Sequence, residues 1–492
     1  MMRLSPKLFL WLAVFAGLGV MILWIEHERA AAGLRAFKAG LEAKGERLSW
    51  NNHVPPMPPA ASNGAPDFNR AAAALPALKP EFQLPRMKLL SPGRARVSWR
   101  QEVLPTDKHP DVWPVVGAIV EENRDLLAEM HAALERPMMV NAIPYERGFE
   151  ALLPHIPKLK SATDLLAIAA LWDLRNGNTN SALTNLVASI RSVSRVREPL
   201  MVSQLIRTGG GTMAVQATWE ALDHDGSSDA QLGAMQRAWE EFDIRDGAVG
   251  AIQMERAMCI AVAAKCRTNV SYLRQVGSVG HSHSSSPVVA AQDIWFQIIW
   301  PAWTSYGDER WMIGRAQIHL DASRLMFASN SYALGKAQMT AAMAAHGEPA
   351  KLHILSSVLT PSVENYFRRV AVFESSRIIA TTAIAVQRHK LRHGKFPEAL
   401  SVLVPEFLPS EPLDFMDGKP LRYRLLPDGQ FLLWSIGDDF VDDGGDGSTA
   451  PGSTSGARVW TQGRDMVWPL PASEAEVAAD NAAMEAKRPK AP

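Results

Sequence analysis

The sequence is poor in cysteine, with only Cys259 and Cys266 among its 492 residues. The two thiols are seven positions apart in a run with helical periodicity, which places them about 10 Å apart along the helix axis. That separation is too large for a disulfide bond between them. The sequence therefore has neither a disulfide framework nor a cluster of zinc ligands, and it predicts two buried, apolar thiols.

Net charge is also missing, because 51 lysine and arginine residues balance 51 aspartate and glutamate residues. A chain without an overall positive field has no general attraction for nucleic acid or for acidic polymers. We therefore expect no nucleic-acid partner.

Familiar catalytic motifs are absent as well. The chain has no Gly-x-Ser-x-Gly, no His-Glu-x-x-His and no dinucleotide-binding fingerprint. The segment "RTGGGT" (207–212) lacks the lysine of a phosphate-binding loop and instead indicates close packing between helices. The sequence predicts no catalytic residue and no organic cofactor.

One long apolar run is present near the start, "LFLWLAVFAGLGVMILWI" at residues 8–25. As a helix it measures about 27 Å, close to the ~30 Å thickness of a bilayer core. Arg3 and Lys7 precede it, so the positive-inside rule predicts a cytoplasmic tip at residues 1–7 and an extracytoplasmic remainder. We expect a single-pass protein of the inner (cytoplasmic) membrane, contacting lipid through residues 8–25. A cleaved signal peptide and a buried core helix are the alternatives.

Four further segments follow from composition and periodicity. Residues 26–50 are predicted to form a helical stalk, and residues 51–114 a proline-rich linker or strap. Residues 115–394 read as a helical body that closes with a long helix at about 363–391. Within this body, residues 161–194 predict a helical hairpin with a Ser161 cap, and its small residues resemble those of one tetratricopeptide repeat.

The character of the chain then changes. Residues 395–470 predict a small antiparallel β unit, because two alternating runs flank a Pro-Asp-Gly turn at 427–429. Residues 471–492 are predicted as a flexible tail, with Ser473 and Glu476 as a capping box. The predicted fold class is therefore mainly α, with an N-terminal transmembrane helix, an irregular array of helical hairpins and a small C-terminal β unit.

The β unit resembles the C-terminal domain of the major pseudopilin of type II secretion over about 60 residues. Phe396-Pro397 stands where that family has Tyr-Pro, and four positions match its Asp-Pro-x-Gly-x-Pro-x-x-Tyr segment. Those four positions are Asp414, Gly418, Pro420 and Tyr423. The family's calcium loop, Ser-x-Gly-x-Asp ending in Gly-Gly, is matched with one extra residue by Ser435, Gly437, Asp439, Gly444 and Gly445.

The resemblance implies a pseudopilin-like end and a calcium loop. The N-terminus departs from the family, since it has no prepilin-peptidase site and over 300 residues separate the apolar run from the β unit. The whole chain looks like bacterial proteins that combine a membrane anchor, a helical body and this end, and that likeness implies architecture without an activity.

The loop from Ser435 to Gly447 places five aspartates and four glycines in thirteen residues. Calcium binds six to eight oxygen ligands, and glycines allow a backbone to curl around an ion. The loop does not follow the EF-hand pattern. We predict a structural calcium site with a solvated turn as the alternative; its ligands would be Asp438, Asp439, Asp442, Asp443 and Asp446.

The favoured function is a membrane-anchored, non-catalytic scaffold or protein-interaction module of the cell envelope, with protein partners on the helical body. One alternative is an envelope hydrolase whose site is assembled only in three dimensions. Another is a pseudopilin-like assembly subunit, which would require processing of the N-terminus by a peptidase.

Overall fold

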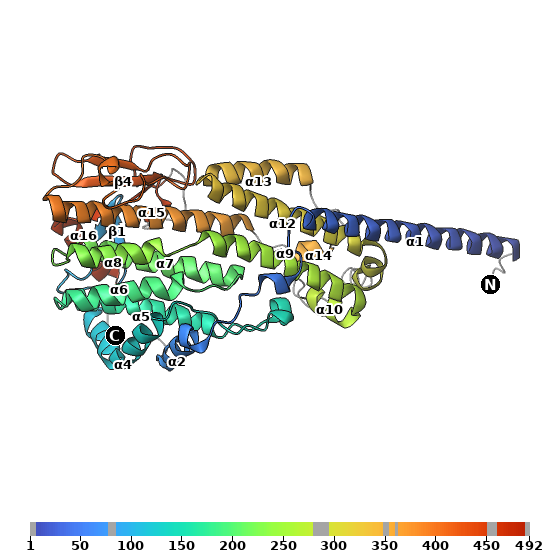
Figure 1. Cartoon of the computed structure of the whole chain (residues 1–492), viewed down its shortest axis with the longest axis horizontal. Helices are drawn as coiled ribbons and strands as arrows, with labels where there is room; N and C mark the ends of the chain where they lie inside the picture. Colours follow the sequence, from blue (N-terminus) through green and yellow to red (C-terminus); the bar gives the residue numbers. More distant parts are fainter. Residues whose placement is uncertain are drawn as a thin grey trace.

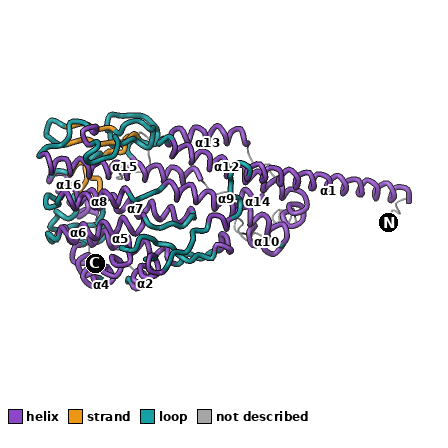
Figure 2. Tube along the Cα trace, viewed as in Figure 1, coloured by secondary structure: helices purple, strands orange, loops and turns teal. Residues whose placement is uncertain are grey.

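Helix α1 (Pro6–Glu42) begins just before the apolar run and continues without a break for 37 residues. The computed structural model describes residues 6–76, 85–278, 295–347, 354–359, 363–449 and 460–487. In it the first part of α1 projects from one end of an elongated, mainly helical body (Figures 1 and 2). Large apolar side chains on this projecting part are exposed, including Leu10, Trp11, Phe15, Val20 and Trp24.

The second part of α1 packs against the body. Leu34 and Leu41 form a small apolar cluster with Ile313 of α12 (Ser305–Ala328). Lys38 pairs with the buried carboxylate of Glu309 on the same helix. The segment predicted as a stalk therefore lies along the body, and the short helix η1 (Trp50–His53) that follows it contacts α9 (Arg245–Thr268).

The proline-rich segment 51–114 is more structured than a linker. It contains η2 (Ala60–Ser62), α2 (Ala65–Ala74), β1 (Lys88–Ser91) and β2 (Arg94–Arg96). Phe68, Ala71 and Ala72 are buried in the main core, and α2 packs on α4 and α5. The prolines break long helices, as expected, but the short elements between them still bury apolar side chains.

Helices build most of the rest of the described body (Figure 1). The first group is α3 (Trp113–Glu122), α4 (Arg124–Leu134), η3 (Tyr145–Glu150), α5 (His155–Arg175), α6 (Thr179–Ser194), α7 (Met201–Leu222) and α8 (Asp229–Glu240). After α9 come α10 (Val270–Ser278), the π-helical η4 (Trp295–Thr304), α12, α13 (Tyr332–His346), α14 (Ile354–Leu359) and α15 (Val363–His393).

The predicted hairpin is confirmed as α5 and α6, which turn at Gly177 with a φ of 73°. Its predicted start at Ser161 is wrong, because α5 already begins at His155 and the Ser161 hydroxyl donates to the carbonyl of Pro157. Asp173 near the end of α5 accepts hydrogen bonds from Ser181 and Asn185 of α6. These bonds fix the turn, while Ala170 and Ala182 are buried in the helical core.

Helix α7 passes through Gly209–Gly211 without interruption. A Cβ on Gly210 would lie 2.7 Å from Val193, and one on Gly211 would lie 2.3 Å from the ring of Phe373. The glycines therefore allow α6 and α15 to approach α7 closely, as the sequence predicted. Cys259 and Cys266 are free, buried thiols of α9, as predicted.

The predicted C-terminal β unit is confirmed as an antiparallel sheet of β3 (Arg422–Leu425), β4 (Phe431–Ile436) and β5 (Asp465–Val467). Strands β3 and β4 form the hairpin about the Pro-Asp-Gly turn, with Gly429 at a φ of 80°. The sheet lies beside α15, joined to it through the short helix η5 (Leu400–Leu403). The turn η6 (Trp460–Gln462) precedes β5.

The last segment is docked, in contrast to the predicted flexible tail. Strand β6 (Leu470–Pro471) pairs in parallel with β2, and α16 (Glu474–Lys487) lies against β1. Ser473 and Glu476 form the predicted capping box. Asp480 of α16 pairs with the buried guanidinium of Arg96 in β2, which is a second contact between these distant parts of the chain beside the pairing of β2 with β6.

Within the part of the chain that the structure describes, two stretches, Asp229–Thr268 and Val363–His393, are long and apolar enough to cross a membrane by length and composition. The protein itself buries 56% and 72% of their respective windows. Burial of this kind is typical of core helices.

Candidate functional site

The acidic loop that follows β4 folds around a carboxylate from a later part of the sequence. Asp465 of β5 is fully buried and accepts hydrogen bonds from the backbone N–H groups of Gly445 (2.7 Å) and Asp446 (3.2 Å). Gly444 and Gly445 have φ values of 72° and 87°, a conformation that glycine adopts without strain. A buried side chain therefore holds the curl of the loop.

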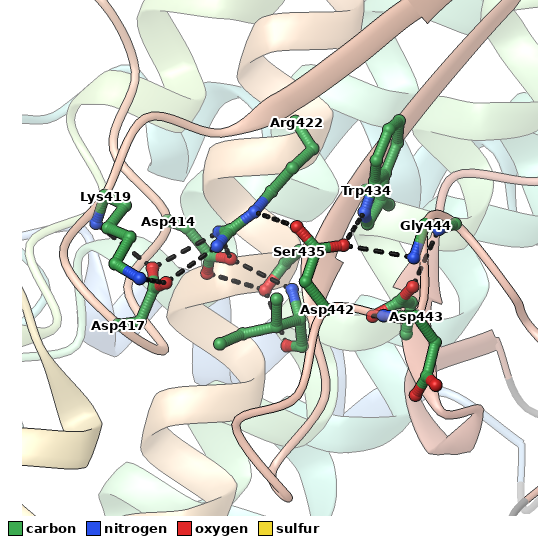
Figure 3. A network of polar contacts seen from close by, with 12 residues as sticks. Asp414, Asp417, Lys419, Arg422, Trp434, Ser435, Asp442, Asp443 and Gly444 are labelled. Atoms are coloured by element: carbon green, nitrogen blue, oxygen red, sulfur yellow. Dashed lines mark hydrogen bonds and ion pairs between the residues drawn. The ribbon is translucent and has the colours of Figure 1, made fainter.

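Arg422 is the main cation of this region (Figure 3). Its guanidinium donates to Asp414 at 2.5 Å, to Asp417 at 2.7 Å and to Asp442 at 3.2 Å. Asp442 also accepts from the indole of Trp434 at 3.0 Å and from the backbone of Gly444 at 3.1 Å. Partial burial opposes the ionisation of Asp442, but these donors together lower its pKa.

Asp414 is fully buried where the sheet meets the segment after α15. It accepts hydrogen bonds from the Ser435 hydroxyl at 2.6 Å and from the backbone of Met416 and Ile436, both at 2.9 Å. Burial raises the pKa of Asp414 in spite of these donors and of Arg422. Asp414 thus connects β4 to the preceding turn, so its role here is structural.

The other predicted ligands have separate partners. Asp438 pairs with Arg368 of α15, and Asp443 pairs with Arg464 at 2.9 Å. Asp446 accepts from the hydroxyl and backbone of Ser448, both at 2.9 Å. Asp439 is exposed and accepts the backbone N–H of Val441 at 3.1 Å.

The loop therefore brings the five aspartates near one another along the chain, but it directs them to different donors. Over residues 435–449, and over the other described ranges, no three acidic, histidine or cysteine side chains are grouped to hold a metal ion. Calcium remains a prediction for this loop, and ligation would require several of these carboxylates to turn from their present donors toward a common point.

The sequence does not predict the groups that hold the loop in place, which are Asp465, Arg464 and Arg368. Asp465 lies in β5, Arg464 directly precedes it and Arg368 lies in α15, and their pairing with the loop depends on the tertiary fold. An aspartate at the start of an otherwise apolar strand was the one available signal, since a buried carboxylate needs donors.

Three of the positions that carry the pseudopilin resemblance, Phe396, Pro397 and Tyr423, meet at one corner of the sheet. The Tyr423 hydroxyl donates to the carbonyl of Pro397 at 2.8 Å, and the rings of Tyr423 and Phe396 both pack on Phe431. These contacts hold the segment just after α15 against β3 and β4. Their effect is to position the sheet on the body.

A second polar cluster was not predicted, and it bears on the hydrolase alternative. Buried Glu198 lies 2.7 Å from the ring nitrogen of His155 and also accepts hydrogen bonds from Asn141 and the Ser203 hydroxyl. A serine nucleophile needs histidine between the hydroxyl and the carboxylate. Here the carboxylate lies between the other two, so the arrangement suits structural pairing.

Comparison of the chain with protein-family models, curated protein sequences and solved structures gave no match.

Proposed function

We propose that this chain is a single-pass scaffold of the cell envelope, anchored in the inner membrane through residues 8–25 with its body on the extracytoplasmic side. The body would present protein-binding surfaces at a fixed distance from the bilayer. The proposal assigns no catalytic step to the chain.

One observation carries the proposal: the projecting part of α1 exposes apolar side chains around its circumference. Leu10, Phe15 and Val20 are each at least 65% exposed, and Trp24 is 63% exposed at the end of the apolar run. Apolar surface in water costs about 25 cal/mol per Å². A bilayer removes that cost, and an indole suits its interface with water.

The coupling between anchor and body supports a scaffolding role. After the apolar run, α1 packs on α12 through Leu34 and Leu41. Beyond it, Glu46 accepts hydrogen bonds from Arg256 of α9 and pairs with Arg324 of α12. A body fixed to its anchor in this way holds partners in a defined orientation to the membrane.

Membrane fractionation tests the anchor. The full-length chain should remain in the membrane pellet after alkaline carbonate extraction, and a C-terminal alkaline phosphatase fusion should be active in the periplasm. A matched chain lacking residues 1–25 should be found in the soluble fraction. Carbonate release of the full-length chain, or an inactive fusion, would contradict the proposal.

The mass of the N-terminal peptide separates the anchor from its alternatives. An intact N-terminus in the membrane fraction agrees with an uncleaved anchor. A new N-terminus near Ala30 would identify a cleaved signal peptide, and cleavage before the apolar run would favour the pseudopilin-like subunit.

Cross-linking in intact cells, followed by mass spectrometry, tests the scaffold itself. We expect cross-links from lysines of the helical body to one or a few envelope proteins, and their loss when residues 1–25 are replaced by a cleavable signal peptide. A chain that cross-links to no other protein would not be a scaffold.

A further inference from the structure

A cavity of about 460 Å³ lies between four segments of the helical body. Its sides are formed by η3 with the loop after it and by the first turns of α7 and α15, and α9 closes it. Its wall is mostly apolar, with Phe149, Leu153, Leu200, Leu205, Met258 and Tyr366. Small-molecule pockets in proteins have volumes of roughly 300–1,000 Å³ and walls of this kind.

Glu255 of α9 is the acidic group in this wall. Within the described ranges, its carboxyl group receives no hydrogen bond and no ion pair. The more deeply buried carboxylates of the body are, by contrast, supplied with donors: Glu46 has Arg256 and Gln317, and Glu220 has the backbone and hydroxyl of Ser98. Burial among apolar groups raises the pKa of Glu255 to about 7.

The surrounding groups do not neutralise this acid. The Tyr366 hydroxyl donates to the carbonyl of Ala248, and Arg369 lies in the exposed part of the cavity wall. An unpaired carboxylate in an apolar wall is unfavourable for folding, and an apolar side chain of similar size would be more stable there. The position therefore makes physical sense if a ligand supplies the missing partner.

Beyond the scaffolding role, and independently of it, we propose that this cavity binds a small organic cation whose ammonium group pairs with Glu255 and whose apolar body fills the space between α7, α9 and α15. A cation near the carboxylate supplies both the charge and the hydrogen-bond donors that the protein leaves out. Leu152 and Val202 extend the apolar surface at the cavity, since they are 75% and 45% exposed. A ligand longer than the cavity would continue over them.

Isothermal titration with three matched probes tests the site. The full-length chain in phosphatidylcholine nanodiscs is titrated at pH 8 with phenethylammonium, its neutral counterpart 2-phenylethanol and the anion 3-phenylpropionate. Empty nanodiscs correct for partition into lipid. We expect phenethylammonium to bind at least about tenfold more tightly than the alcohol, because it pairs with the ionised carboxylate, and the anion to bind most weakly.

Two variants assign the preference to the residue. Glu255→Gln keeps the shape of the side chain and should remove the tenfold preference while leaving the affinity for 2-phenylethanol nearly unchanged. Glu364→Gln, an exposed acid in the first turn of α15, should leave all three affinities unchanged.

Three results would overturn the proposal. They are equal affinities for the amine and the alcohol in the wild type, tighter binding of the anion, and binding of none of the probes. Retention of the amine preference in Glu255→Gln would equally assign it to another group. None of these outcomes affects the result of the carbonate extraction. The proposed ligand site and the proposed membrane anchor are therefore tested independently.

Discussion

Glu255 and Glu46 are two acids of the body whose surroundings move their pKa values in opposite directions. Burial raises the pKa of Glu255 to about 7, because no described group donates to it. Burial acts in the same sense on Glu46, but hydrogen bonds from Arg324, Gln317 and Arg256 outweigh it and lower the pKa of Glu46 to about 2. Donors in the fold, and not burial alone, therefore decide which acid stays ionised.

The raised pKa of Glu255 predicts that the stability of the protein falls as pH rises. The unfolded chain releases this proton near pH 4.5, whereas the folded chain keeps it to about pH 7, so folding loses stability between these two values. Glu255→Gln cannot ionise and should be more stable than the wild type by about 2–3 kcal/mol at pH 8. At pH 4.5 the two proteins should have nearly the same free energy of unfolding. Urea unfolding of the full-length chain at both pH values measures this, and an equal gain at both would contradict it.

Helix α7 offers a matched pair of substitutions at the scale of an element. Gly211→Ala would push a methyl group into the buried ring of Phe373 and should destabilise the protein by about 1–3 kcal/mol. Gly209→Ala meets nothing within 4 Å and should stabilise it by up to about 1 kcal/mol. Thermal unfolding compares the two variants. Equal effects would mean that helix propensity, and not packing against α15, governs this segment.

The acidic loop gives a second prediction at this scale. Calcium should raise the unfolding temperature of the full-length chain by several degrees over chelator, because a bound ion stabilises the folded state. Replacing both Asp439 and Asp443 by alanine should abolish the rise, and magnesium should not reproduce it. If calcium does not change the unfolding temperature of the wild type, the loop has no calcium site and is held only by its arginine partners and Asp465.

The sequence predicted those elements whose signal is local. The alternating runs around Pro-Asp-Gly became β3 and β4, and the long apolar periodicity became α15. The aspartates of the loop were evident for the same reason, since they are adjacent in the chain. Their partners were not, because Arg368 and Arg464 reach the loop from other elements and no local pattern records such pairs.

At the scale of the whole molecule, the errors fall on segments that depend on distant contacts. Residues 51–114 looked like a linker, yet β2 pairs with β6 from the other end of the chain. The tail looked flexible, yet α16 docks through Asp480 on Arg96. Short elements of this kind are stable only once the partner strand or helix is in place, so composition alone underestimates them.

The join between the N-terminal segment and the body gives a prediction for the whole molecule. Glu46→Gln should destabilise the protein by about 3–5 kcal/mol, because it leaves the buried guanidinium of Arg256 without a charge partner. The wild type should also lose stability as pH falls from about 4.5 toward 2, when Glu46 takes up a proton.

Asp321→Asn is the matched control for Glu46→Gln. Its carboxylate is half exposed and lies 3.6 Å from Arg324, so its loss should cost less than about 1 kcal/mol. Urea unfolding of both variants at pH 7 measures the difference. Similar losses in the two would show that the Glu46 cluster does not fix the join.

Because α1 runs unbroken from its projecting turns to those packed on α12, the body cannot rotate independently of the apolar, projecting part of this helix. Each residue inserted into the helix near Ile25 would turn the body by about 100° and lift it by 1.5 Å. A series of alanine insertions should therefore abolish partner contacts and restore them at about every third or fourth inserted residue. The length of this helix would then set the direction in which the body faces.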